Sequence, residues 1–218
     1  MTPSGGGDPL HRYKPHKHWV ALRFNPLQKP FQTVTQPVTL EKLMDLKKPN
    51  SEKTVNQEQL CLECGMCCNG VIFADVRLRK GDDGARLRAM GLRMKGKSMF
   101  CQPCAALEGC RCRIYEKRPR YCREFECTVL QSFNSGKLKK GSALRIIREA
   151  KKRVRRVKEL LRKLGDRDEE EDLRGRFRRM ARKLERPDLD EVTGRAYGEL
   201  TLAMHDLNQL LREAFYPG

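Results

Sequence analysis

Cys61-Leu-Glu-Cys64-Gly-Met-Cys67-Cys68 places four thiols within eight residues. All ten cysteines of the 218-residue chain lie between Cys61 and Cys127, and the segments on either side contain none. Thiols separated by two residues can point at one position in space, which is typical of metal ligands. The sequence therefore predicts a metal-binding segment in the middle of the chain.

The number of thiols allows more than one metal site. Four thiolates complete one tetrahedral zinc site or one iron–sulfur cluster, so ten suffice for two sites with two left over. Adjacent Cys67 and Cys68 point to opposite sides of an extended chain, so they serve two metals or bridge a pair. The spacing also resembles that of bacterial ferredoxins, although the closing Cys-Pro is missing. The expected cofactor is zinc or iron, the latter as an ion or in an iron–sulfur cluster.

A second cysteine block follows, with Cys112-Arg-Ile-Tyr115 and Arg118-Pro119-Arg-Tyr-Cys122-Arg123-Glu-Phe125. Together with Cys61–Cys68, this block resembles the YkgJ-type cysteine-cluster family, a CxxCxxCC zinc- or iron-chelating domain. The resemblance covers residues 61–127. It implies metal ligands at Cys61, Cys64, Cys67, Cys68, Cys104, Cys112, Cys122 and Cys127.

Three residues of the second block are candidates to support the metal ligands. Arg118 and Arg123 would offset the charge of the thiolates and donate hydrogen bonds to sulfur, and Tyr115 would anchor the site through its hydroxyl. In the alternative interpretation, Arg118 stands at a helix start, Arg123 is solvated and Tyr115 is a core aromatic. Cys101 and Cys110 are extra thiols, which we do not expect to be obligatory ligands.

The expected fold class is α+β, mostly α overall, with a small irregular metal-stabilised cysteine-rich domain followed by amphipathic helices. Within the cysteine-rich part, short strands are predicted at 71–73 and 76–78, and a helix at 85–94. The predicted regions are a flexible tail (1–18), an extended segment packing on the core with a short helix near 39–46 (19–60), the cysteine-cluster domain (61–136), and a helical hairpin or three-helix arm (137–218).

The arm is expected to contain three amphipathic helices. Apolar residues recur from Ile147 to Leu164 at three- and four-residue spacing, and Gly165 is a helix stop. Asp166-Arg-Asp-Glu169 has the form of a capping box that opens a second helix, with apolar residues from Leu173 to Leu184. Asp188-Leu-Asp-Glu191 opens the third by the same device. Its apolar stripe is Leu189, Val192, Ala196, Leu200, Ala203, Leu207, Leu210 and Ala214.

The charge is concentrated in residues 137–186, where 21 Lys and Arg residues against 9 Asp and Glu residues give +12 of the total +18. Such a surface attracts nucleic acid or an acidic protein partner. Alternatively, the acidic third helix folds back on it. The candidate polyanion contacts are Lys151, Lys152, Arg153, Arg155 and Arg156.

The favoured function is metal binding through the cysteine cluster. One alternative is a metal-dependent protein-modifying enzyme, because flagellin lysine N-methylases carry a similar cysteine segment. The other is a nucleic-acid-binding accessory protein that uses the basic arm. The first residues lack the apolar core of a secretory signal, and no stretch is apolar enough to cross a membrane, which predicts a cytoplasmic location.

Overall fold

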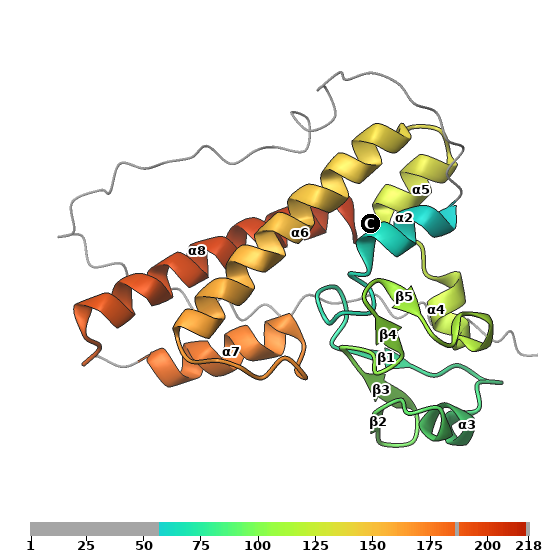
Figure 1. Ribbon diagram of the computed structural model, residues 1–218, viewed down its shortest axis with the longest axis horizontal. Coiled ribbons are helices and arrows are strands. Elements are labelled where there is room, and N and C mark those ends of the chain that lie inside the picture. Colours follow the sequence, from blue (N-terminus) through green and yellow to red (C-terminus); the bar gives the residue numbers. More distant parts are fainter. Residues whose placement is uncertain (1–56, 186–187, 217–218) are drawn as a thin grey trace, which may run out of the picture. The chain divides into compact units, whose positions relative to one another are not determined.

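The computed structural model describes residues 57–185 and 188–216. The expected tail, most of the expected extended segment and its short helix lie outside the described residues. Long helices dominate the described part and its strands are short, so the predicted class, mostly α with some β, is confirmed (Figure 1). The elements are α2 (Gln57–Cys64), β1 (Asp75–Arg77), α3 (Gly84–Ala89), β2 (Met94–Lys95), β3 (Met99–Cys101), β4 (Leu107–Glu108), β5 (Arg111–Cys112), a 3₁₀ turn (Tyr115–Lys117), α4 (Arg120–Glu124), α5 (Thr128–Asn134), α6 (Lys140–Lys163), α7 (Leu173–Leu184) and α8 (Glu191–Ala214).

Helices α6 and α8, each of 24 residues, pack against one another (Figure 1). The predicted apolar stripes form their contact faces, because residues three and four positions apart share one side of a helix. Val157 and Leu161 of α6 and Leu200 and Leu207 of α8 are fully buried. No helix in the described ranges combines the length and apolar character needed to cross a bilayer.

Helix α7 begins later than predicted. Its N-cap is Asp172, whose carboxylate accepts a hydrogen bond from the backbone N–H of Gly175 at 3.0 Å. The prediction that Asp166 opens this helix is therefore wrong. Asp166 is instead buried, and its carboxylate accepts a hydrogen bond from the Arg176 guanidinium at 2.8 Å. The local motif predicted a helix cap at Asp166, but this residue forms a tertiary ion pair instead.

The N-cap of helix α8 also lies two residues later than predicted. Asp190, and not Asp188, accepts the backbone N–H of Thr193, at 2.9 Å. Val192 then falls in the first turn of the helix and is 72% exposed, so its predicted place in the buried stripe is wrong. The buried face of α8 starts one turn further on, at Ala196.

The strands form a small antiparallel sheet in the order β1-β3-β2, in which Phe100 lies between Val76 and Met94. The predicted strand at 76–78 corresponds to β1. The predicted strand at 71–73 is wrong, because the chain bends there and the N–H of Ile72 donates to the carbonyl of Met66 at 3.1 Å. A two-stranded hairpin, β4-β5, follows.

Helix α3 is shorter than the predicted helix at 85–94. Gly91 adopts a φ of 90°, and the N–H of Leu92 bonds back to the carbonyl of Leu87 at 3.1 Å, which ends the helix at Ala89. The chain is then free to enter β2 at Met94. The apolar spacing in the sequence continues beyond Gly91, although the helix ends before it.

Two short helices were not predicted. Residues 57–60, expected to be extended, form the first half of α2, and α5 follows the last cysteine. The sequence of α2 lacks an amphipathic period, and α5 has only seven residues, so neither gave a local signal. Both are held by tertiary packing on α6, against which they bury Leu60, Val129 and Leu130.

The buried apolar residues form two clusters. The first joins α2, α5, α6, α7 and α8. The second belongs to the sheet and consists of Val76, Leu87, Leu92, Phe100 and Ala106. Phe73 packs against both clusters and so links the helical and sheet parts of the protein.

We expect Gly70→Ala to lower the free energy of unfolding by about 2–3 kcal/mol. Gly70 has a φ of 79°, and a Cβ there would lie 3.0 Å from the Cα of Asp172. The matched control is Gly81→Ala, since Gly81 has a φ of 96° but nothing within 4 Å of a Cβ. Urea unfolding should give a loss of roughly 1–2 kcal/mol for the control. Equal losses in the two variants would contradict a tight contact at Gly70.

Candidate metal centre

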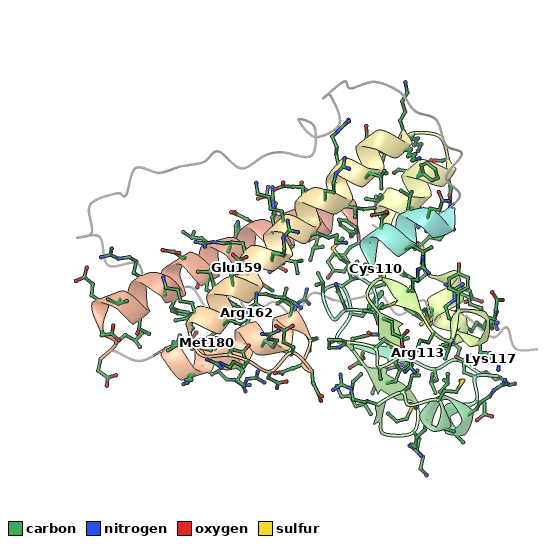
Figure 2. All side chains as sticks on the ribbon, viewed as in Figure 1. Cys110, Arg113, Lys117, Glu159, Arg162 and Met180 are labelled. Atoms are coloured by element: carbon green, nitrogen blue, oxygen red, sulfur yellow. The ribbon has the colours of Figure 1, made fainter. Side chains whose placement is uncertain are left out.

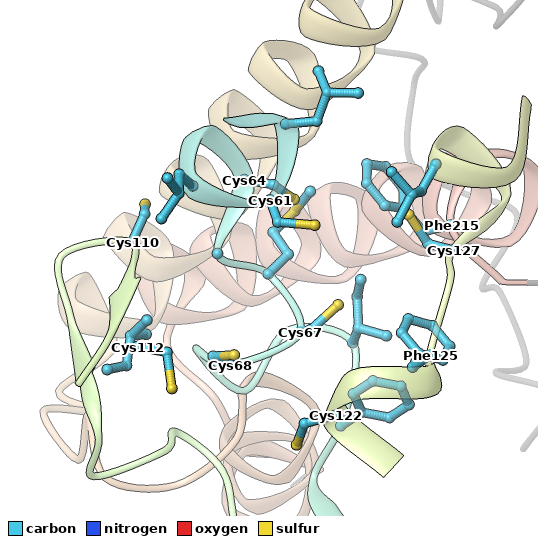
Figure 3. Close-up of a pocket in the computed structure, with 18 of the residues that line it drawn as sticks. Cys61, Cys64, Cys67, Cys68, Cys110, Cys112, Cys122, Phe125, Cys127 and Phe215 are labelled. Carbon is cyan, nitrogen blue, oxygen red and sulfur yellow. The ribbon is translucent and has the colours of Figure 1, made fainter. Parts of the chain in front are cut away.

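Thiols from separate parts of the chain gather around one cavity of about 130 Å³ (Figure 3). This volume is roughly ten times the 10–15 Å³ that a single buried water requires, so the thiols surround a real space. They come from α2, the turns after it, the β4-β5 hairpin, α4 and the N-terminus of α5. The cysteines that line the cavity are Cys61, Cys64, Cys67, Cys68, Cys110, Cys112, Cys122 and Cys127.

The first block is shaped by the end of α2. Cys61 and Cys64 lie three residues apart on one face of the helix, Cys61 exposed and Cys64 buried. Gly65 ends the helix with a φ of 67°, and its carbonyl accepts the N–H of Cys68 at 3.0 Å. This tight turn folds Cys67 and Cys68 back toward the thiols of the helix.

A backbone hydrogen bond joins the later cysteines to the first block. The N–H of Cys104 donates to the carbonyl of Cys68 at 2.7 Å, and Cys112 pairs with Leu107 across the hairpin. Cys104 is not among the residues that line the cavity, but this hydrogen bond joins it to Cys68, which is. The helical turn predicted after Pro119 is α4, which carries Cys122.

Burial holds these thiols in the neutral form. It raises the pKa of Cys64, Cys68 and Cys122 to about 12, and that of Cys67 well above its ordinary value. Neighbouring thiols add repulsion. Nearby backbone amides act in the opposite direction, that of Met66 on Cys64 being one example. Bringing several such groups together as thiolates is unfavourable unless a cation is present.

All ten cysteines are free thiols. In the ranges that the structure describes, no three Cys, His, Asp or Glu side chains are arranged to hold a metal ion, so the sulfurs surround the cavity without sharing one coordination point. The donor chemistry nevertheless fits a metal. Among the described lining residues, the side chains of ligand type are all thiols, with no His, Asp or Glu. Soft thiolates bind zinc, iron–sulfur clusters or Cu(I), and bind hard cations such as Mg²⁺ poorly.

The three supporting residues lie in different surroundings. Arg118 lines the cavity and lowers the pKa of Cys68 and Cys122, in opposition to burial and the neighbouring thiols. Its guanidinium lies 3.4 Å from the centre of the Tyr115 ring, and its Nε donates to the Tyr115 carbonyl at 2.8 Å. Arg123 is exposed on α4, away from the cavity lining. Arg118 therefore lies at the cavity and Arg123 does not, and the supporting roles of both stay predictions.

Lys151 and Cys110 meet at the cavity, which the sequence did not indicate. Lys151 was a candidate polyanion contact, but its Nζ donates to the carbonyl of Glu63 at 2.8 Å and lies 3.8 Å from the Sγ of Cys110. These residues are 88 and 41 positions from Lys151, so no local motif could have joined them. Cys101 belongs to β3 and is not among the lining residues.

The other candidate polyanion contacts belong to α6, the helix that also carries Glu159 and Arg162 of Figure 2, and they fall into two pairs. Arg153 binds Glu149 and donates to the backbone carbonyl of Asp206 on α8, and Arg156 forms an ion pair with Glu199 on α8. The acidic third helix therefore does fold back on part of the basic arm. Lys152 and Arg155 are exposed and form no ion pair with the described residues. Nucleic-acid contact stays a prediction that rests mainly on these two.

Residues 60–152 match the family model described as "CxxCxxCC: Putative zinc- or iron-chelating domain". The match covers under half of the chain and includes both cysteine blocks, so the resemblance inferred from them is confirmed. It extends past the last cysteine through α5 and into the first half of α6. The searches of curated proteins and of solved structures gave no match.

Proposed function

Residues 60–152 carry a domain of the CxxCxxCC zinc- or iron-chelating family, and from this premise we propose that the protein is a thiolate metal-binding protein whose metal has a structural role. The ligands that we assign are Cys61, Cys64, Cys67, Cys68, Cys104, Cys112, Cys122 and Cys127.

One observation carries the proposal. Thiols from a stretch of 67 residues, from Cys61 to Cys127, surround one cavity. Seven of the eight assigned ligands line that cavity, and the eighth, Cys104, bonds through its backbone to Cys68. A purely apolar core would not require thiols from five different segments to face one cavity.

The donor set supports a closed site. Catalytic zinc sites commonly keep three protein ligands and leave one position for water, whereas structural sites are completed by four. Eight thiols are enough to complete two sites of four, and the cavity wall is otherwise mainly apolar, with Ile72, Phe73 and Phe125 among its residues. This environment favours a centre that is shielded from water.

The position of the cavity supports a role in folding. Leu60, Ile72 and Phe215 line it and belong to the first core, whereas Val76 lines it and belongs to the second. Metal bound by these thiols would hold the segments around the cavity in place on both cores. The protein-modifying alternative stays a prediction.

The test is elemental analysis of the intact chain purified without oxygen, together with its visible absorption spectrum and its content of acid-labile sulfide. We expect tightly bound zinc or iron, with the thiols protected from alkylation until the metal is removed. Colourless protein with zinc would identify a zinc centre, and coloured protein with iron and sulfide an iron–sulfur centre. A folded chain that contains neither metal and has ten readily alkylated thiols would contradict the proposal.

A further inference from the structure

The cysteines around the cavity separate into two groups by the apolar core on which they rest. Cys64 is a buried member of the first core, and Cys67 and Cys127 pack against the same core. Cys104 and Cys122 pack against the second core instead. Cys67 and its neighbour Cys68 fall into different groups, because the carbonyl of Cys68 accepts a hydrogen bond from the N–H of Cys104.

The strongest thiol neighbours of Cys67, Cys68 and Cys122 fall within the same groups. Apart from the effect of burial, Cys67 is influenced most by Cys64 and then by Cys127. Cys61, one helical turn before Cys64, is a further neighbour of both Cys64 and Cys67. In Figure 3, Cys61, Cys64 and Cys127 lie on one side of Cys67.

The remaining thiols form the second group. Cys68 is influenced most by Cys104 and Cys112, and Cys122 by Cys68, Cys104 and Cys112. Links between the groups also exist, since Cys68 influences Cys67 and Cys61 influences Cys68. Backbone geometry places the thiols that pack on neither core. Cys61 lies one helical turn before Cys64, Cys68 is hydrogen-bonded to Cys104, and Cys112 pairs with Leu107, whose N–H donates to the carbonyl of Cys104.

We propose that the thiols form two separate four-thiolate metal sites that share no ligand; this inference rests on the metal-binding function proposed above. The helix-side site consists of Cys61, Cys64, Cys67 and Cys127. The sheet-side site consists of Cys68, Cys104, Cys112 and Cys122.

Each site has its own basic residue. Four thiolates around a divalent ion carry a net charge of −2, which a nearby cation offsets. Lys151 donates to the carbonyl of Glu63, the residue before Cys64 of the helix-side site, at 2.8 Å. Arg118 lines the cavity together with Cys112 and Cys122 of the sheet-side site.

Among the described residues no three ligand side chains are arranged to hold an ion, so closure of either site requires rotation of its cysteine side chains. A cysteine has one side-chain torsion that moves its sulfur, and rotation between staggered positions leaves the backbone in place. Adjacent Cys67 and Cys68 leave the chain toward different groups, as alternating side chains do. The two sites can therefore be neighbours in the chain without sharing a bridging sulfur.

The first test counts metal ions per chain. After loading with Zn²⁺, or with Co²⁺ as a spectroscopic probe of four-thiolate geometry, we expect two ions per wild-type chain. Cys64→Ser and Cys122→Ser should each retain one ion, and the double variant none. Cys101→Ser is the matched control and should retain two, because Cys101 is outside both sites.

The second test needs no variant, so it remains decisive if a serine variant fails to fold. X-ray absorption of the zinc-loaded wild-type chain should give four sulfur neighbours at about 2.3 Å and no short zinc–zinc distance. A zinc–zinc distance of a sulfur-bridged pair, or loss of both ions from a single variant that remains folded, would overturn the two-site assignment alone. A wild-type chain that binds neither Zn²⁺ nor Co²⁺ would overturn the proposed function itself.

Discussion

Removal of the metal with a chelator under reducing conditions is expected to unfold the cysteine-rich part of the protein, residues 57–127. The second core has only five buried apolar residues, and the thiols that line the cavity make no other cross-link. Structural zinc contributes about 10–16 kcal/mol in small metal-dependent domains, so its loss should exceed what this core can replace. The effect should be the largest of any single treatment of this chain.

Hydrogen exchange measured along the chain is the appropriate observable, because it reports local unfolding. We expect amide protection in β1, β3 and α4 to fall by at least about 100-fold, which corresponds to roughly 2.7 kcal/mol at 25 °C. Protection in the middle of α6 and α8, where Val157 and Leu207 are fully buried, should fall much less. Unchanged protection in the sheet after complete removal of the metal would contradict a structural role for it.

The second large effect is expected for Asp166→Ala. Asp166 and Arg176 form an ion pair at 2.8 Å in which the side chains are only 4% and 1% exposed. Breaking a buried pair by removing one partner leaves an uncompensated charge, which typically costs 3–5 kcal/mol. We therefore expect a loss of about 3–5 kcal/mol in the free energy of unfolding, measured with urea by the helical circular dichroism signal.

Asp168→Ala provides the matched control for this prediction. Asp168 also binds an arginine, Arg179, at 3.1 Å, but its side chain is 47% exposed. Exposed pairs contribute about 0–1 kcal/mol, so the control should lose no more than that. In Asp166→Ala combined with Arg176→Met, a substantial part of the lost stability should return, because no buried charge remains at position 176. Equal losses for the variants of Asp166 and Asp168 would contradict the importance of burial.

The same carboxylate predicts a pH dependence. Burial by itself would raise the pKa of Asp166, but the hydrogen bonds from Arg176 and Arg179 outweigh it, so the pKa is lowered from 3.8. The folded protein therefore binds this proton less readily than the unfolded chain. The stabilisation is fully present above pH 4 and is lost as the pH falls through the lowered pKa. In Asp166→Ala, this part of the acid-induced loss of stability should be absent.

Local sequence patterns predicted the features that depend on residues close together in the chain. The spacing of Cys61–Cys68 and of Cys112–Phe125 predicted a metal-binding family, which the family comparison confirms over residues 60–152. The apolar period of the arm predicted buried faces for α6 and α8, because helical periodicity is a local property. Cap positions were predicted less accurately, because four aspartates are all chemically able to cap a helix: Asp166, Asp172, Asp188 and Asp190.

Sequence alone determined that this chain has a thiol-rich segment of zinc- or iron-chelating type and amphipathic helices after it, because spacing and periodicity are written into short stretches. Only the tertiary structure decided which thiols are neighbours, that Lys151 lies beside Cys110, and that Asp166 pairs with Arg176 in the interior. These contacts depend on how separate segments pack, and that of Lys151 with Cys110 joins residues 41 positions apart. No short-range pattern specifies such packing, since its free energy comes from burying surfaces that are distant in the chain.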